Sequence, residues 1–172
     1  MQVGIVGFGN VGRQVAATLE SGAIPGVHLA CVTHTDLIAA AEAAKDVCPG
    51  ALVLSIDELI DSSDLIVETA TAASFPDIAQ RVIVAGKTLI AVSAAGVLEL
   101  PQLYELAAKH RAKVIFASGM LPGLDLIRSA REGDITRVTL TTTLRPDSLL
   151  QEPYIVDRQM KLPTTPGEVV EV

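Results

Sequence analysis

Short apolar runs alternate with longer Ala- and Leu-rich stretches from Met1 to Ala117, and this alternation is the strongest constraint on the fold. The short runs are rich in Val, Ile and Leu, which is typical of strands, and the stretches between them have helical periodicity. Continuous apolar strands that alternate with helices indicate a parallel sheet covered by helices on both faces. The sequence therefore predicts a doubly wound α/β domain.

The same patterns predict where the elements lie. Strands are expected at residues 3–6, 27–32, 51–54, 65–67, 88–92 and 114–117. Helices are expected near residues 10–20, 36–44, 56–60, 72–85, 100–111 and 124–132. After these elements, alternating apolar and polar residues at 135–145 predict a strand of a second sheet. A proline-rich segment then leads to a last short strand signal at 169–172.

The first predicted strand is followed by the sequence GFGNVG, in which Gly7, Gly9 and Gly12 form a G-x-G-x-x-G pattern. In such patterns the first glycine permits a tight turn, the second lets the backbone approach a pyrophosphate, and the third lets the helix pack closely on the sheet. The phosphates then lie at the positive end of the helix. The pattern follows a strand, opens an amphipathic helix and precedes a second strand, which is the context that a dinucleotide site requires. A glycine-rich turn that binds no nucleotide is the alternative.

These features together predict a doubly wound parallel Rossmann sheet that binds NAD or NADP over residues 1–118. Residues 119–172 are expected to form an incomplete α+β second domain for substrate binding or oligomerisation. The predicted cofactor-binding residues lie in the glycine turn and at the carboxyl ends of three strands. They are Gly7, Phe8, Gly9, Asn10, Val11, Gly12, Thr33, His34, Ala70, Thr71 and Ser93. The small residues at the strand ends are equally consistent with tight turns that have no binding role.

The choice between NAD and NADP depends on the end of the second predicted strand. A carboxylate there accepts the ribose hydroxyls of NAD, and its absence leaves room for the 2′-phosphate of NADP. The sequence places Thr33, His34 and Thr35 at these positions, and Asp36 follows them. Asp36 is also a suitable N-cap for the next helix. We expect tolerance of NADP, and both cofactors remain open.

Composition and charge exclude several other classes of function. The formal net charge is −7 and no basic stripe is present, so we expect no nucleic-acid partner. Every apolar stretch is interrupted well before the roughly 18 residues that a membrane-spanning helix needs, and strand-like sequence already begins at Val3. We therefore expect a cytoplasmic protein without a membrane anchor. Cys31 and Cys48 form no C-x-x-C pair and have no histidine at metal-ligand spacing, so we expect buried or free thiols and neither a disulfide nor a metal site.

Four stretches together resemble one family. GFGNVG, LIVETAT, AVSAAGVL and SGMLPGLDLIRSAREGDITRVTLTTTLRP are similar to segments of the L-aspartate dehydrogenases. The resemblance implies an oxidoreductase of amino-acid metabolism and NAD biosynthesis. It implies oxidation of the small-molecule substrate L-aspartate to iminosuccinate, which hydrolyses to oxaloacetate and ammonia. Because Rossmann dehydrogenases usually associate, we also expect a homo-oligomer.

The resemblance assigns further residues and shows some departures. Met120 corresponds to an alanine of the family that contacts the cofactor, and Pro122 replaces a glycine. In the same loop, Ser118 and Gly119 are expected to contact the substrate. Arg145 is the candidate for binding a substrate carboxylate, although relatives carry two cations there and this chain carries one. A solvated charge is the alternative for Arg145.

The resemblance identifies no catalytic residue in this chain. In the family, the catalytic histidine and a cofactor-contacting asparagine lie beyond the counterpart of Val172. His28, His34 and His110 stand at positions that do not suit the same role. The sequence is thus interpreted as a truncated aspartate dehydrogenase. A non-catalytic dinucleotide-binding protein or remnant, and another Rossmann reductase acting on a semialdehyde or a cyclic imine, are the alternatives.

Overall fold

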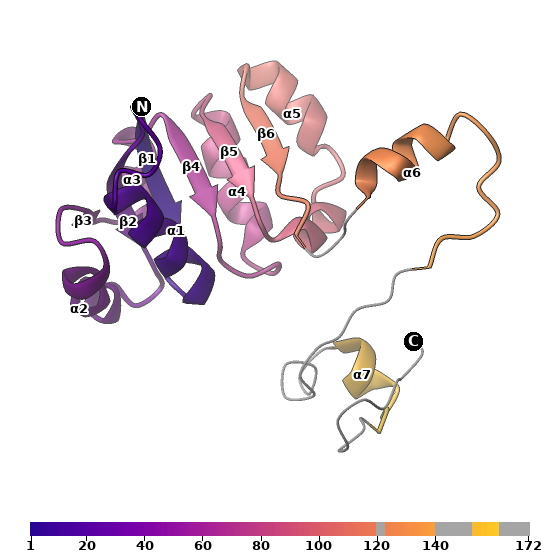
Figure 1. Ribbon diagram of the computed structural model, residues 1–172, viewed down its shortest axis with the longest axis horizontal. Helices are drawn as coiled ribbons and strands as arrows, with labels where there is room; N and C mark the ends of the chain where they lie inside the picture. The colour runs from indigo at the N-terminus through magenta and orange to yellow at the C-terminus, as the bar shows by residue number, and fades with distance from the viewer. Residues whose placement is uncertain (120–122, 140–152, 162–172) are drawn as a thin grey trace. The chain divides into compact units, whose positions relative to one another are not determined.

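Six parallel strands form one sheet in the order β3-β2-β1-β4-β5-β6 (Figure 1). The computed structural model describes residues 1–119, 123–139 and 153–161. The strands are β1 (Gln2–Val6), β2 (His28–Thr33), β3 (Leu52–Val53), β4 (Leu65–Glu68), β5 (Thr88–Ala91) and β6 (Lys113–Phe116). Each lies within one residue of its predicted bounds. This strand order is that of the Rossmann fold, so the predicted fold class is confirmed.

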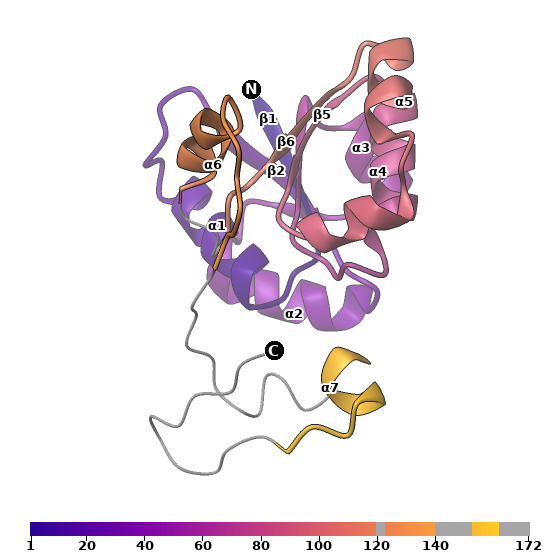
Figure 2. The same ribbon diagram turned by 90° about the vertical axis from the view of Figure 1, so that its right-hand side faces the viewer.

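Helices cover both faces of the sheet. They are α1 (Asn10–Glu20), α2 (Leu37–Val47), α3 (Ile56–Asp61), α4 (Phe75–Val84) and α5 (Leu103–His110), with a 3-10 helix η1 (Ala94–Glu99) between β5 and α5. One apolar core joins the sheet to α1 and α2. The other joins it to α3, α4 and α5, which lie together on the opposite side of the sheet (Figure 2).

Two helices begin three residues later than predicted, and proline explains the difference at α5. Leu100 precedes Pro101 and has φ −132° and ψ 66°, outside the helical region. The residue before a proline is disfavoured in helical conformation because the ring crowds it. The chain therefore forms η1 first and begins α5 at Leu103. At α4, residues 71–74 form a turn in which Thr71 and Ser74 hydrogen-bond through their hydroxyls, at 3.0 Å.

The chain divides into two units, Met1–Gly119 and Met120–Val172. The described part of the second unit contains α6 (Leu124–Ala130) and α7 (Pro153–Asp157). Of the strand predicted at 135–145, residues 135–139 are described and are not in a strand, and the rest lies outside the described residues. An alternating pattern indicates that a segment has one apolar and one polar face, but a strand also needs a partner backbone for its hydrogen bonds. No described residue pairs with residues 135–139. The predicted strand at 169–172 also lies outside the described residues.

In the described part of the chain, no helix combines the length and the apolar character that a bilayer crossing requires.

Candidate functional site

A cavity of about 630 Å³ opens at the carboxyl ends of β1, β2 and β4. Its lining comes from the glycine turn, the strand ends and the starts of three helices. The lining residues are Val6, Gly7, Gly9, Thr33, His34, Thr35, Leu37, Ser55, Ile56, Thr69, Ala70, Thr71, Ser74, Asp77 and Ile78. In open α/β sheets, ligands bind at the topological switch point, where the connections that follow two neighbouring strands run to opposite faces of the sheet. Here the switch point lies between β1 and β4. The cavity has the place and size of a small-molecule site.

Gly7 makes the turn out of β1. It has φ +95°, and a Cβ built on it would lie 2.6 Å from the backbone nitrogen of Ala70, so a side chain would be both strained and obstructed. The backbone nitrogen of Gly7 donates to the carbonyl oxygen of Thr33 at 3.0 Å. Its carbonyl oxygen accepts from Thr69 Oγ1 at 2.6 Å. The turn is therefore held between the ends of β2 and β4.

The other two glycines of the pattern differ sharply in their surroundings. A Cβ on Gly9 would meet no atom within 4 Å, so the backbone here faces open space. A Cβ on Gly12 would overlap the carbonyl oxygen of Gly7 and lie 2.8 Å from Thr69 Oγ1. Gly9 thus leaves room for a ligand to approach the backbone, whereas Gly12 allows α1 to pack against the turn.

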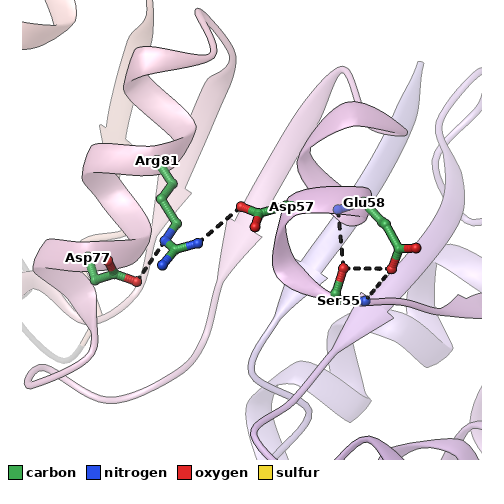
Figure 3. Close-up of polar contacts among 5 residues, drawn as sticks. All are labelled: Ser55, Asp57, Glu58, Asp77 and Arg81. Atoms are coloured by element: carbon green, nitrogen blue, oxygen red, sulfur yellow. Dashed lines mark hydrogen bonds and ion pairs between the residues drawn. The ribbon is translucent and has the colours of Figure 1, made fainter.

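The start of α1 lacks the side-chain caps that close the next two helices. Gly9 is its N-cap, without a side-chain hydrogen bond, and its first turn contains no acidic residue. Asp36 caps α2, and the side chains of Ser55 and Glu58 form a capping box at α3 (Figure 3). The first N–H groups of a helix need acceptors and carry a partial positive charge. Those of α1 therefore fit the phosphates of a dinucleotide.

Helices α3 and α4 support one wall of the cavity. Arg81 donates from Nε to Asp77 Oδ2 at 2.9 Å and pairs with Asp57 Oδ1 at 3.1 Å, which joins the two helices (Figure 3). These carboxylates raise the pKa of Arg81. Asp77 lines the cavity, and its carboxylate is paired with Arg81.

Hydrogen bonds from Ser55 lower the pKa of Glu58, so the capping box of α3 is complete near neutral pH and weakens as acid protonates Glu58.

Asp36, the acid that follows β2, does not line the cavity. Thr33 is buried and His34 is exposed, and His34 Nδ1 accepts from the backbone nitrogen of Asp36 at 3.2 Å. Asp36 Oδ1 accepts from the backbone nitrogens of Ile38 and Ala39, at 3.0 and 2.9 Å. The acid that could bind ribose hydroxyls thus serves as the N-cap of α2. This arrangement supports the prediction that NADP is tolerated.

We expect Asp36→Ala to reduce the stability of the domain by about 1 kcal/mol, because α2 loses its cap. The affinity for NAD should change less than twofold, since the carboxylate is engaged in capping. Urea unfolding and a NAD titration test the two parts. Asp46→Ala, an exposed acid on the same helix, is the charge-matched control. A much larger loss of NAD affinity in Asp36→Ala than in the control would show that Asp36 contacts the ribose.

The structure brings some of the predicted cofactor-binding residues to the cavity and not others. Gly7, Gly9, Thr33, His34, Ala70 and Thr71 line it. Phe8 is only 2% exposed and packs in the core, where Arg13 lies over its ring and donates to its carbonyl oxygen. Asn10, Val11 and Gly12 form the first turn of α1, and Ser93 follows β5. Ser118 and Gly119 are exposed after β6, and Met120 and Arg145 lie outside the described residues.

Several lining residues were not predicted. Ile56 and Ile78 contribute apolar side chains from the starts of α3 and α4, and Thr69 holds the glycine turn. Ile56 and Thr69 stand just after predicted strands, at the edge where ligands bind, and this position is their signal in the sequence. Ile78 lies within a predicted helix and has no such signal. Glu68 was not predicted as a site residue either, although a charged residue at the end of the apolar run LIVE is unusual.

The histidines and cysteines offer few groups for acid-base chemistry near the cavity. Of the histidines, His34 lines it, whereas His28 begins β2 and His110 ends α5. Cys31 and Cys48 are buried and free, as predicted, and burial raises the pKa of the Cys31 thiol. Within the described ranges, no three His, Cys, Asp or Glu side chains are grouped so as to hold a metal ion.

The strand order, the glycine turn and the uncapped start of α1 define a dinucleotide-binding domain of the Rossmann class. The comparison with protein families agrees. The chain belongs to the family described as the NAD-binding domain of homoserine dehydrogenase, whose model matches residues 7–117. The predicted class of cofactor, NAD or NADP, is thereby confirmed.

Individual relatives are L-aspartate dehydrogenases. The one from Methanosarcina mazei is 32% identical over 174 residues, covering 99% of this chain and 64% of that protein. The one from Methanothermobacter thermautotrophicus is 32% identical over 152 residues, covering 87% of this chain and 58% of that protein. The resemblance to this family is confirmed, and the chain spans 58% to 64% of the length of these two relatives.

Solved structures show the same fold. Aspartate dehydrogenase from Thermotoga maritima matches 77% of this chain and 52% of that chain, with a TM-score of 0.57 and 21% identity. GenD2 from gentamicin A biosynthesis, in complex with NAD, matches 77% of this chain and 38% of that chain, with a TM-score of 0.61 and 24% identity. At these identities the likeness supports the fold alone.

Proposed function

We propose that this chain is the dinucleotide-binding part of an NAD(P)-dependent L-aspartate dehydrogenase, with L-aspartate as its substrate. The observation that carries the proposal is similarity to L-aspartate dehydrogenases over nearly the whole chain, 99% of it for the relative from Methanosarcina mazei. The open glycine turn supports the cofactor half of the proposal.

Each part of the site then has a role. The first turn of α1 binds the pyrophosphate, and the end of β2 and the apolar residues Ile56 and Ile78 surround the adenosine. A bound nicotinamide would supply the acceptor for the hydride on Cα of L-aspartate, whose amino group would lose a proton to solvent as iminosuccinate forms. This chain's own contribution is to hold the cofactor and present one face of it to the substrate. Arg145 is proposed to bind a substrate carboxylate.

The test is turnover with L-aspartate and either NAD or NADP, followed as the appearance of reduced nicotinamide. Reduction with L-aspartate supports the proposal. Turnover only with a semialdehyde or a cyclic imine, run in the reductive direction, would instead identify another reductase of the same fold. Cofactor binding without turnover on any of these substrates would favour the second candidate, a non-catalytic dinucleotide-binding protein.

That second candidate has one observation in its favour. Among the described histidines only His34 lines the cavity, and its Nδ1 already accepts a hydrogen bond from the backbone of Asp36. It is therefore poorly placed to act as a base for the substrate amine. A homo-oligomer and a cytoplasmic location stay predictions.

We expect Ser118→Ala to lower substrate-dependent reduction about tenfold, the size of effect that one lost hydrogen bond produces. Cofactor affinity should change less than about threefold. Ser118 is exposed where the chain leaves β6, at the edge of the sheet where ligands bind. Steady-state kinetics and cofactor titration on the same preparation separate the two effects. A loss confined to cofactor affinity would show that this loop contacts the nicotinamide alone.

A further inference from the structure

Glu68 is a fully buried acid at the carboxyl end of β4. Its exposed fraction is 0%, and it lies opposite Val6 in the pairing of β4 with β1. Burying a carboxylate costs free energy unless hydrogen bonds or charges compensate. The ion pairs found among the described residues do not include Glu68. Hydrogen bonds must therefore provide the compensation.

Three donors from two loops surround this carboxylate. Oε1 accepts from the backbone nitrogen of Ala70 at 2.7 Å and from Ser93 Oγ at 2.9 Å. Oε2 accepts from the backbone nitrogen of Ser93 at 3.0 Å. An ionised carboxylate only accepts hydrogen bonds, so a set made up of donors suits its charged form. One side chain thereby connects the loop after β4 to the loop after β5.

The two loops lie beside the half of the crevice opposite the adenosine. A Rossmann sheet has two mononucleotide-binding halves that meet at the switch point between β1 and β4. The residues at the end of β2 form the part of the cavity wall that suits the adenosine, so a bound nicotinamide would lie toward β4 and β5. Ala70 itself lines the cavity. Glu68 would therefore place a negative charge on the nicotinamide side of the crevice. The charge of that part of the cofactor changes in the reaction, because the oxidised nicotinamide ring is positive and the reduced ring is neutral.

We propose that Glu68 is a positioning residue of the cofactor site, which fixes Ala70 and Ser93 through its hydrogen bonds and favours the oxidised over the reduced nicotinamide through its charge. The inference rests on the proposed use of a nicotinamide cofactor and not on the identity of the substrate. The charge effect distinguishes this role from a purely structural one, because a structural acid would affect the binding of both redox forms equally.

The experiment compares the dissociation constants of NAD⁺ and NADH for the wild-type chain, Glu68→Gln and a control. Glu68→Gln keeps the shape but removes the charge, and should shift the ratio of the two constants by roughly threefold to tenfold in favour of NADH. Asp64→Asn is the matched control, because Asp64 precedes the same strand at its amino end, where it accepts from the backbone nitrogen of Gln2. Its ratio should equal that of the wild type. An unchanged ratio in folded Glu68→Gln would overturn the proposal.

Ser93→Ala gives an independent measurement that does not depend on the folding of Glu68→Gln. It keeps the charge and removes the Ser93 hydroxyl bond to Glu68. Both redox forms should bind about threefold to tenfold more weakly, which is the typical net effect of losing one hydrogen bond, and their ratio should stay constant. Unchanged affinity for both forms would refute the positioning role. If the wild-type chain binds neither form, the proposed function fails as well, whereas binding without turnover on L-aspartate leaves the inference on Glu68 intact.

Discussion

Replacing Gly9 with leucine is expected to abolish cofactor binding and leave the fold intact. A Cβ at this position meets no protein atom within 4 Å, and the backbone has φ −82°, so a side chain can be attached here without a clash at Cβ or backbone strain. The side chain would occupy the space through which a pyrophosphate reaches the first N–H groups of α1. Losing two hydrogen bonds to charged phosphate oxygens costs about 3 kcal/mol or more, which weakens binding roughly 100-fold or more.

Titration with NADH and thermal unfolding measure the two sides of this expectation. Gln14→Leu is the control, because it adds the same side chain at an exposed position one turn further along α1. It should bind the cofactor as the wild type does. Unchanged affinity in Gly9→Leu would show that the pyrophosphate does not bind at the start of α1.

Gly12→Ala is expected to destabilise the domain by about 2 to 3 kcal/mol, the cost typical of overpacking a buried site. The added Cβ would overlap the carbonyl oxygen of Gly7 and lie 2.8 Å from Thr69 Oγ1. These atoms cannot easily move, because Thr69 and Gly7 are themselves hydrogen-bonded. Alanine favours a helix over glycine by about 1 kcal/mol, so the steric penalty must exceed that gain.

Urea unfolding measures the effect, and Gly9→Ala provides the matched comparison. The same methyl group is added three residues earlier, where it meets nothing. We expect Gly9→Ala to unfold close to the wild-type midpoint and Gly12→Ala to unfold well below it, or to fail to fold. Equal midpoints for the two variants would show that α1 does not pack against the glycine turn as the structure has it.

The strands could be predicted closely because both faces of a parallel sheet are buried. Each strand is then a continuous apolar run with polar or small residues at its ends. The two late helix starts depended on local geometry instead, namely Pro101 and the turn at residues 71–74. The strand expected at 135–145 shows the limit of periodicity, because its described residues, 135–139, have no partner strand.

The candidate site was predictable only in part. The glycine pattern identified Gly7, Gly9 and Gly12 because the required backbone geometry is local. The use of Asp36 could not be decided from its position, since both a cap and a ribose contact fit the sequence, and its bonds to Ile38 and Ala39 show that it caps α2. The pairing of Arg81 with Asp57 joins residues from two helices and leaves no local signal.

The sequence by itself determined the fold class, the glycine turn and the family resemblance, because each depends on residues close together in the chain. The tertiary structure decided what only neighbouring strands can bring together. Placing β1 beside β4 brings Thr69 to Gly7, and placing β4 beside β5 brings Ser93 to Glu68. Strand order is set by how the helices cover the two faces of the sheet, so contacts that depend on it follow from packing and not from local spacing.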